Sequence, residues 1–426
     1  MPLTIDLYDP QPCYYGDERI TGRVIFQTTT PVDINEIRVT FSGTAKAKIQ
    51  KVKGSGAPAA NYRSKCLLFE TGRTLWEKDD EPLSPGTYEC PFDFVFPTHV
   101  QPSAMSKWPE QAPFRNDESH PLPPTFALEA ADATRKLDCF VDYRLEAQVF
   151  KPQRGFMGSK APLYSEVMTF NFMPSLAASN IAEDEPGNVT YRQQKEQLFT
   201  VRSKMLLMEN KGRSLNLQER LHSWLLPSQL PRFSYKVLFT YPTRFTQAVP
   251  VVCSLDVTPF MEDSSVSLPP DILLQAVSLT IVSRTAARAT PSLMGSMSAE
   301  IDERIEILSR RSLRKPVLGT MDLGDVFGPL TLRHTDISFG TFNIARTYRL
   351  CSSFVFECAG KTDELVLPDL PIDLIARSRD LSRDVSRDVK EEEVTGEAAQ
   401  FPVQEALPCY TPTSPSSVST HVVEKM

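Results

Sequence analysis

Hydrophobic and polar residues alternate along much of this chain. Ile37, Val39 and Phe41, for example, are separated by Arg38 and Thr40. Because successive side chains of a strand point to opposite faces of a sheet, this pattern predicts antiparallel strands with one face on a core and the other in water. The 35 prolines argue against a helical protein, since proline interrupts the hydrogen bonds of a helix. The alternation therefore indicates an all-β fold.

Two further segments near the start of the chain support this fold. In residues 91–97, phenylalanines alternate with other residues between two prolines, which mark where strand pairing begins and ends. Residues 141–149 show the same alternation. Residues 98–121, between these segments, are rich in proline and predict a long loop whose role the sequence leaves open. Several short strands with turn signals between them favour a β-sandwich.

A second block of alternating residues follows a polar stretch. Residues 176–197 carry no hydrophobic pattern, and we interpret them as a junction between two domains. Beyond it, we expect strands at 233–241, 249–257, 273–281, 341–356 and 364–367. The predicted boundaries are a first β-sandwich over residues 1–175, the junction over 176–197, a second β-sandwich over 198–375 and a disordered tail over 376–426.

Length and composition suit this arrangement. A chain of 426 residues, 41% of them hydrophobic, can bury a sizeable core and points to two or three domains. No uninterrupted apolar run is long enough to cross a membrane as a helix. The first residues also lack the basic, apolar and small-residue order of a signal peptide. We therefore expect a cytoplasmic protein.

The cysteines and the charge exclude several functions. The eight cysteines stand singly, with no C-x-x-C pair and no histidine at zinc spacing, so we expect reduced thiols and no metal site. A net charge of −7 argues against nonspecific binding of nucleic acid.

Motifs for catalysis are missing from the sequence. We find no G-x-G-x-x-G, no P-loop, no H-E-x-x-H and no G-x-S-x-G, and the five histidines stand far apart. The sequence therefore predicts a protein that is not an enzyme and needs no cofactor. A catalytic triad assembled in space stays open as a distant alternative, because such triads are recognised by geometry and not by order.

The last fifty residues carry the most specific short motif. Leu407, Pro408 and Tyr410 form an L-P-x-Y peptide in a stretch with no core-forming pattern. Such a peptide can lie as a polyproline II strand whose proline and tyrosine rings fill two grooves of a WW domain. The alternative is a chance occurrence in a solvated tail.

Lys46, Lys48, Lys51 and Lys53 form the clearest basic cluster. The first two extend the polar face of a predicted strand. The cluster can bind acidic or phosphorylated cytosolic peptides, or an anionic membrane surface. Alternatively, the lysines protect an exposed edge strand from pairing, which is the commoner use of such charges.

Four residues of the tail stand in patterns typical of phosphorylation sites. Ser382 and Ser386 follow an upstream arginine, whereas Thr411 and Ser414 precede proline. Phosphate beside Tyr410 would add about two negative charges and tune WW binding. The alternative is a merely solvated linker.

Several groups of residues, taken in order, resemble the strands of arrestin domains. They are Tyr14-Tyr15-Gly16-Asp17, Ile20 to Val24, Ile37 to Gly43, Leu122 to Phe126, Val141 to Leu145, Asn343 to Leu350 and Cys358 to Lys361. The resemblance spans roughly residues 3–375. With L-P-x-Y behind both domains, the chain is similar to the α-arrestins, most of all to the fungal arrestin-related trafficking adaptors.

This resemblance implies a fold and a function. The fold is two tandem arrestin-like, immunoglobulin-type antiparallel β-sandwiches. The implied function is an adaptor that links cytosolic segments of membrane transporters or receptors to a HECT-type ubiquitin ligase, so that the cargo is ubiquitinated and internalised. Leu407, Pro408 and Tyr410 would bind the WW domains of the ligase. The protein would be cytoplasmic and recruited peripherally to the plasma membrane or endosomes.

The chain also departs from the family pattern. It shows one L-P-x-Y motif where members often carry several, so avidity from tandem WW binding is lost unless a second contact exists. The buried charge cluster that restrains visual and β-arrestins cannot be located by matching residues. An arrestin-fold trafficking or signalling scaffold that acts without ligase recruitment is therefore the main alternative.

Overall fold

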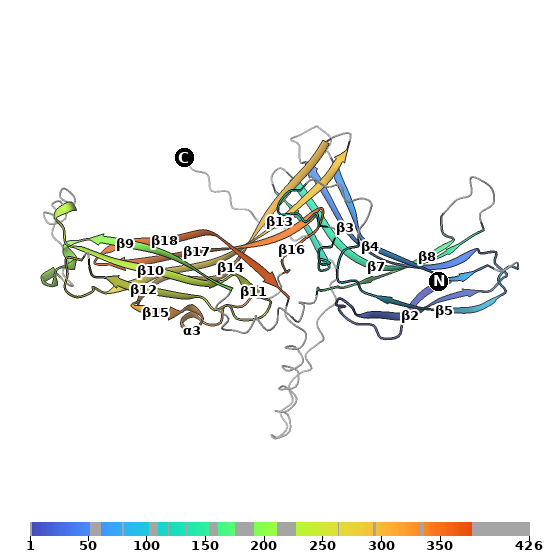
Figure 1. Ribbon diagram of the computed structural model, residues 1–426, viewed down its shortest axis with the longest axis horizontal. Coiled ribbons are helices and arrows are strands. Elements are labelled where there is room, and N and C mark those ends of the chain that lie inside the picture. Colours follow the sequence, from blue (N-terminus) through green and yellow to red (C-terminus); the bar gives the residue numbers. More distant parts are fainter. Residues whose placement is uncertain are drawn as a thin grey trace, which may run out of the picture. The chain divides into compact units, whose positions relative to one another are not determined.

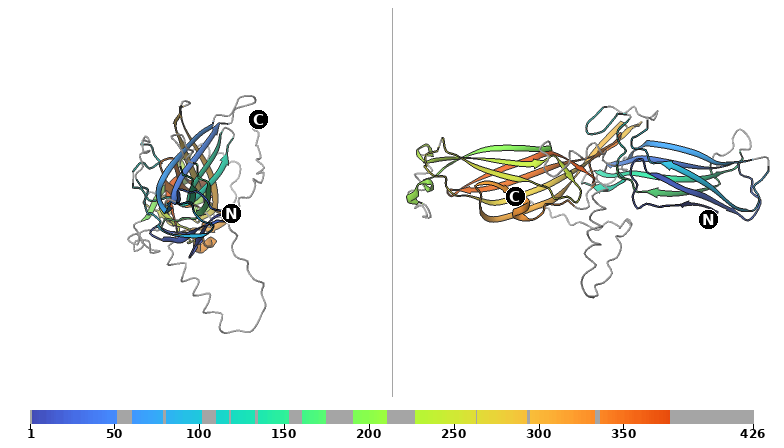
Figure 2. Two further views of the ribbon diagram at one scale, coloured as in Figure 1. Left: turned by 90° about the vertical axis from the view of Figure 1, so that its right-hand side faces the viewer. Right: turned by 60° about the horizontal axis from the view of Figure 1, so that its bottom comes forward.

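The computed structural model describes residues 2–376, except residues 52–60, 79–80, 102–109, 118, 133–134, 153–160, 175–190, 211–226, 263, 293–294 and 333–335. Within this part the chain forms two β-sandwiches, each made of two sheets (Figures 1 and 2). The prediction of an all-β fold is therefore confirmed. None of the helices in the described residues has the length and apolar character that crossing a membrane requires.

The first sandwich contains the N-terminal strands. One sheet has the order β1 (Leu3–Leu7), β2 (Arg19–Thr28) and β5 (Gly86–Val95). The facing sheet has the order β4 (Asn61–Glu77), β3 (Glu36–Lys51), β7 (Arg135–Phe150) and β6 (Phe126–Ala131), with β8 (Tyr164–Phe170) also paired to β7. All of these pairings are antiparallel.

The second sandwich begins after residues 175–190, which lie outside the described part. Its smaller sheet has the order β15 (Gly319–Asp322), β12 (Ser254–Phe260), β10 (Arg232–Pro242) and β9 (Arg192–Arg202). The larger sheet has the order β11 (Arg244–Thr246), β18 (Lys361–Ile375), β17 (Ile344–Cys358), β13 (Ile272–Ser292) and β14 (Gly295–Pro316), and β16 (Phe339–Gly340) pairs with β17. The described helices are short: α3 (Leu323–Phe327) and the 3-10 turns η2 (Lys204–Leu206), η3 (Met208–Asn210) and η4 (Pro227–Gln229).

Aromatic rings fill the core of the first sandwich. Phe41 of β3 meets Phe69 and Phe96 edge to face, with ring centroids 4.9 and 4.8 Å apart. Such pairs add about 0.5–1.5 kcal/mol each to the burial of the rings. The hydroxyl of Tyr143 donates a hydrogen bond to the carbonyl oxygen of Pro123 at 2.6 Å, so its buried polar atom has a partner.

Strand β13 belongs to both cores. Its first half, including Leu274 and Ile281, packs in the core of the second sandwich. Its second half carries Ala287 and Ala289 into the core of the first sandwich. Figure 1 shows β13 between the strands of the two sandwiches. Small side chains suit this place, because they allow the backbones of packed sheets to come close. The two sandwiches are thus joined by packing as well as by the chain.

Parts of the second sandwich differ from the prediction. We predicted a junction over residues 176–197, but β9 begins at Arg192, and residues 175–190 lie outside the described part. Residues 192–198 are exposed, so this edge strand is held by backbone pairing with β10 and needs no hydrophobic alternation. The strand predicted at 249–257 begins only at Ser254. The sequence did not predict β14, because its many charged residues obscure a weak alternation of hydrophobic and polar side chains.

The packing of Gly43 generates a testable prediction. A Cβ atom at Gly43 would lie 2.8 Å from ring atoms of both Phe69 and Tyr143. Gly43→Ala should therefore lower the free energy of unfolding by about 1–3 kcal/mol through overpacking. The measurement is urea denaturation followed by tryptophan fluorescence. Gly72→Ala in the same sheet is the control, since its Cβ would come no closer than 3.7 Å to another residue. Equal stability of the two variants would contradict the packing described here.

Candidate functional site

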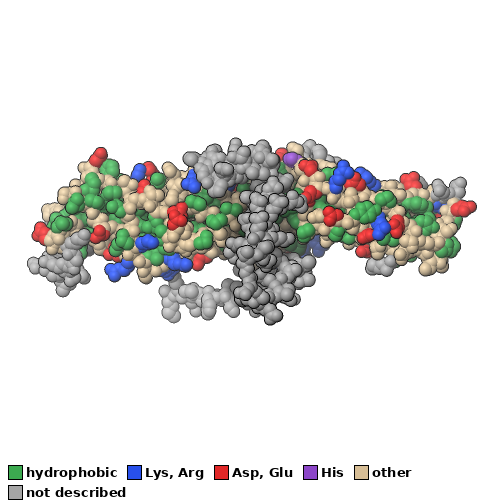
Figure 3. Space-filling view, turned by 90° about the horizontal axis from the view of Figure 1, so that it is seen from below, with side chains coloured by type: hydrophobic (Ala, Val, Ile, Leu, Met, Phe, Trp, Pro, Cys, Tyr) green, Lys and Arg blue, Asp and Glu red, His purple; other side chains and the backbone are tan. Residues whose placement is uncertain are grey.

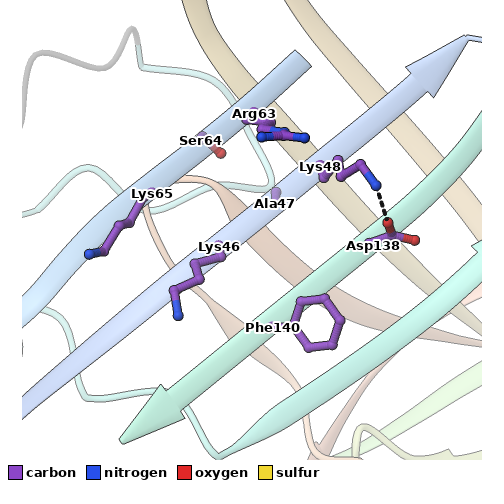
Figure 4. A pocket seen from close by; sticks show the side chains of 8 residues that line it. All are labelled: Lys46, Ala47, Lys48, Arg63, Ser64, Lys65, Asp138 and Phe140. Atoms are coloured by element: carbon purple, nitrogen blue, oxygen red, sulfur yellow. Dashed lines mark hydrogen bonds and ion pairs between the residues drawn. The ribbon is translucent and has the colours of Figure 1, made fainter. Parts of the chain in front are cut away.

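A basic hollow lies on the five-stranded sheet of the first sandwich. Side chains of β3, β4 and β7 line a space of about 560 Å³. The lining residues are Lys46, Ala47, Lys48, Arg63, Ser64, Lys65, Asp138 and Phe140 (Figure 4). We call this set the basic hollow.

Strand register gathers the basic side chains. Lys46 of β3 lies opposite Lys65 of β4, and Lys48 lies opposite Arg63. Residues that face each other across an antiparallel pair point to the same side of the sheet. The four cations therefore project from one face, where Phe140 of β7 lies beside Lys46 (Figure 4).

The two lysines of β3 already have acidic partners. The Nζ atom of Lys46 lies 2.9 Å from Oδ1 of Asp142, and that of Lys48 lies 3.2 Å from Oδ2 of Asp138. Both lysine side chains are about one third exposed, at 38% and 33%. The Lys46–Asp142 pair is partly exposed on both sides. Such a pair contributes only about 0–1 kcal/mol, so an anionic ligand can compete for Lys46.

Arg63 and Lys65 are the available cations of the hollow. Both are exposed, and neither has an ion pair with another described residue. A guanidinium group offers paired N–H donors that match a carboxylate or a phosphate, and an ammonium group adds a mobile charge. The half-buried ring of Phe140 offers an apolar contact beside these charges. The hollow is therefore suited to an acidic segment with an adjoining apolar side chain.

The structure places only some of the predicted site residues here. Lys46 and Lys48 line the hollow. Lys51 of β3 pairs in register with Arg135 of β7. It stands an odd number of residues after Lys48, so its side chain points to the opposite face of the sheet. Lys53 lies outside the described residues, as do the tail residues Leu407, Pro408, Tyr410, Ser382, Ser386, Thr411 and Ser414.

Sequence reasoning missed Arg63 and Lys65. They stand two residues apart, as Lys46 and Lys48 do, which is the spacing of one strand face. Pairing the segments around residues 46–48 and 63–65 as neighbouring strands would have brought all four charges together. On the face of the molecule shown in Figure 3, basic side chains stand in small groups among acidic ones.

Buried polar contacts lie behind the hollow. Ser64 points to the opposite side of β4 from Arg63, and its hydroxyl donates to the carbonyl oxygen of Arg288 at 2.9 Å. The side-chain amide of Asn343 donates to Ser64 Oγ at 2.9 Å and to the carbonyl oxygen of Ala45 at 3.2 Å. These bonds tie β3 and β4 of the first sandwich to β13 and to the residue before β17.

A buried arginine adds a second polar cluster. Arg346 of β17 donates to the hydroxyls of Tyr348 and Thr285 at 2.7 and 2.8 Å. Its guanidinium also pairs with Glu303 at 3.3 Å and with Asp336 at 3.5 Å. Burial raises the pKa of Asp336, in spite of the positive charge of Arg346. Burial likewise raises the pKa of Tyr348 to about 12. The cluster therefore keeps one buried positive charge paired within the second sandwich.

Comparison with known proteins supports the resemblance to arrestins over the first sandwich. Residues 3–160 match the family model described as arrestin (or S-antigen), N-terminal domain. The match includes β1 to β7, and thus the basic hollow, and it supports an arrestin-family protein. An arrestin domain supports a general role as an adaptor in trafficking or signalling. No curated protein gives a significant match to the chain.

The contact behind the hollow generates a prediction about how the sandwiches are joined. Asn343→Ala removes two buried hydrogen bonds and should weaken the contact by about 1–3 kcal/mol. Hydrogen exchange of the amides of β3 and β4 should then speed up by about tenfold or more. Thr347→Ala is the control, because Thr347 lies on β17, which directly follows Asn343, and is only half-buried. Unchanged exchange in Asn343→Ala would show that the contact contributes nothing.

Proposed function

We propose that this arrestin-domain protein is a cytoplasmic adaptor that links membrane transporters or receptors to a HECT-type ubiquitin ligase. One observation carries the proposal: a basic hollow lies within the region that matches the arrestin N-terminal domain, and an L-P-x-Y peptide follows the two sandwiches. In this proposal the hollow binds the cargo and the peptide binds the ligase. Ubiquitination of the cargo then leads to its endocytosis.

The hollow supplies the cargo-binding surface in this account. Arg63 and Lys65 make the first ion pairs with an acidic cytosolic segment, because no described acidic residue occupies them. Lys46 exchanges its aspartate partner for the same segment at small cost, and Lys48 adds its charge to the surface. Phe140 contacts an apolar side chain of the segment. An anionic membrane surface offers similar charges, and the experiment below separates the two.

The tail supplies the ligase-binding peptide. Pro408 presets the polyproline II backbone, and the rings of Pro408 and Tyr410 fill the two grooves of a WW domain. Leu407 adds an apolar contact before the proline. Phosphorylation of Ser382, Ser386, Thr411 or Ser414 would add about two negative charges per site and alter this binding.

The cytoplasmic location has support from cysteine chemistry. Cys90, Cys139, Cys253, Cys351 and Cys358 are free thiols. Free thiols are the usual state in the reducing cytosol, whereas secreted proteins tend to pair them. From the cytoplasm, the protein would be recruited peripherally to the plasma membrane or to endosomes through its cargo.

A scaffold without ligase recruitment is the second candidate. It is favoured by the single L-P-x-Y motif, because one weak WW contact gains nothing from avidity. In that case the sandwiches alone would carry the function. Deletion of residues 377–426 separates the two candidates: it abolishes cargo ubiquitination by an adaptor and spares the function of a scaffold.

One prediction of the proposed function concerns the ligase-binding peptide. Tyr410→Ala in the full chain should weaken binding of a tandem WW module by about tenfold or more, since the ring that fills one groove is lost. Cys409→Ala is the matched control, because the position between Pro408 and Tyr410 is variable in the motif. Binding is measured by isothermal titration calorimetry. Equal affinity of the Tyr410→Ala variant and the unmodified chain for the WW module would contradict the ligase-adaptor proposal.

Another prediction of the proposed function concerns the basic hollow. The double variant Arg63→Glu with Lys65→Glu should bind a fluorescent Asp/Glu-rich peptide about tenfold more weakly, and added salt should weaken binding to the unmodified chain. Arg192→Glu with Lys195→Glu, on exposed positions of β9, changes the net charge equally and is the control.

Vesicles test the competing ligand for the same surface. If vesicles containing phosphatidylserine bind the unmodified chain and the peptide does not, the hollow binds membrane and not cargo. Equal peptide affinity of the two double variants would contradict any role of the hollow.

A further inference from the structure

A segment of the predicted 98–121 loop is docked on the second sandwich. We call residues 110–117 and 119–122 the docking segment. The amide of Arg115 donates to the carbonyl oxygen of Thr341 at 3.1 Å. A Cβ atom at Gly340 would lie 3.1 Å from Cγ of Arg115 and 3.4 Å from the carbonyl oxygen of Pro113. Backbone and side chains of the segment therefore lie closely against residues 340–341.

Arg288 of β13 holds the middle of the docking segment. Its Nη2 atom donates to Oδ1 of Asn116 at 2.6 Å, and its guanidinium carbon lies 4.5 Å from the centroid of the Phe114 ring. Its Nε atom donates to the carbonyl oxygen of Phe342 at 2.6 Å. One buried arginine thus contacts the segment and the second sandwich at once. Its own carbonyl oxygen accepts the hydrogen bond from Ser64, beneath the basic hollow.

His120 lies at the end of the docking segment and has no access to solvent, with an exposed fraction of 0%. Its Nδ1 atom lies 2.8 Å from the carbonyl oxygen of Asp117. A carbonyl oxygen only accepts, so Nδ1 carries the proton and Nε2 is bare in the neutral ring. The Nε2 atom is buried and has no hydrogen-bond partner. The ring meets Phe342 edge to face, with centroids 4.9 Å apart.

We propose that the docking segment is a pH-sensitive latch between the two sandwiches, with His120 as its titrating residue. Neutral His120 fits the apolar contact with Phe342. A proton added at Nε2 creates a buried cation whose new N–H group has no acceptor, which costs free energy unless the ring moves out. Release of the ring would take the docking segment off residues 340–342 and remove the contacts of Arg288 with Asn116 and Phe114.

The charged groups around His120 do not offset this cost. Asp117 favours the protonated ring, whereas Arg115 and His99 oppose it. On the side of the second sandwich, the guanidinium of Arg288 contacts the segment. Burial is the largest influence, and it lowers the pKa of His120 below the ordinary value of 6.5.

The sign of the pH effect follows from this lowered pKa. Well above pH 6.5 the ring is neutral whether the segment is docked or released, so the latch does not depend on pH. As the pH falls below 6.5, the released ring takes up a proton that the docked ring resists. The docked state is therefore favoured at neutral pH and loses up to about tenfold in population ratio per pH unit on acidification.

Hydrogen exchange of the full chain at pH 7.5 and pH 5.5 tests the latch. After correction for intrinsic rates, amides of the docking segment and of residues 338–343 should lose protection at the lower pH, by about tenfold. His120→Phe keeps an aromatic ring but cannot be protonated, so its protection should not change with pH. Loss of the pH effect in this variant supports the proposal. Equal protection of the unmodified chain at both pH values, or the same loss in His120→Phe, overturns it.

A second measurement decides the matter even if His120→Phe does not fold. Histidine ring signals of the unmodified chain can be followed by NMR as the pH falls. His120 should titrate below the ordinary histidine pKa of 6.5. A His120 signal that titrates at or above pH 6.5 would overturn the proposal.

Discussion

Strand β13 is the element on which the whole structure depends, because one continuous strand contributes to two hydrophobic cores. Leu274 packs in the second core and Ala287 in the first. A boundary between independent domains normally falls in an exposed linker with few contacts. Here the boundary is crossed by a strand whose backbone is paired on both sides, by β14 and β17. The hydrogen bonds of Arg288, Ser64 and Asn343 then fix the contact between the two sandwiches.

This arrangement gives the basic hollow a rigid support. Arg63 and Lys65 alternate with Ser64, so the strand that offers the cations on one face holds the contact with Arg288 and Asn343 on the other. Binding groups on paired strands are positioned more precisely than groups on loops. A ligand in the hollow therefore meets side chains whose backbone is fixed from behind.

Much of the fold could be predicted from the sequence, whereas the site could be predicted only in part. Alternation revealed the strand around Val39 and the second block around Phe239, because each has one face on a core. It failed for β9 and β14, where backbone pairing holds charged edge strands that bury few side chains. Lys46 and Lys48 were found because they are close in sequence, but grouping them with Arg63 and Lys65 required the register of β3 and β4.

An adaptor must hold two partners at once, and this is the central claim. The most direct test is native mass spectrometry of the full chain with a tandem WW module and an Asp/Glu-rich peptide, each at saturating concentration. The account predicts a ternary complex, with each ligand bound as tightly in the presence of the other as alone. Mutual exclusion of the two ligands, or a chain that binds only one of them, would contradict it.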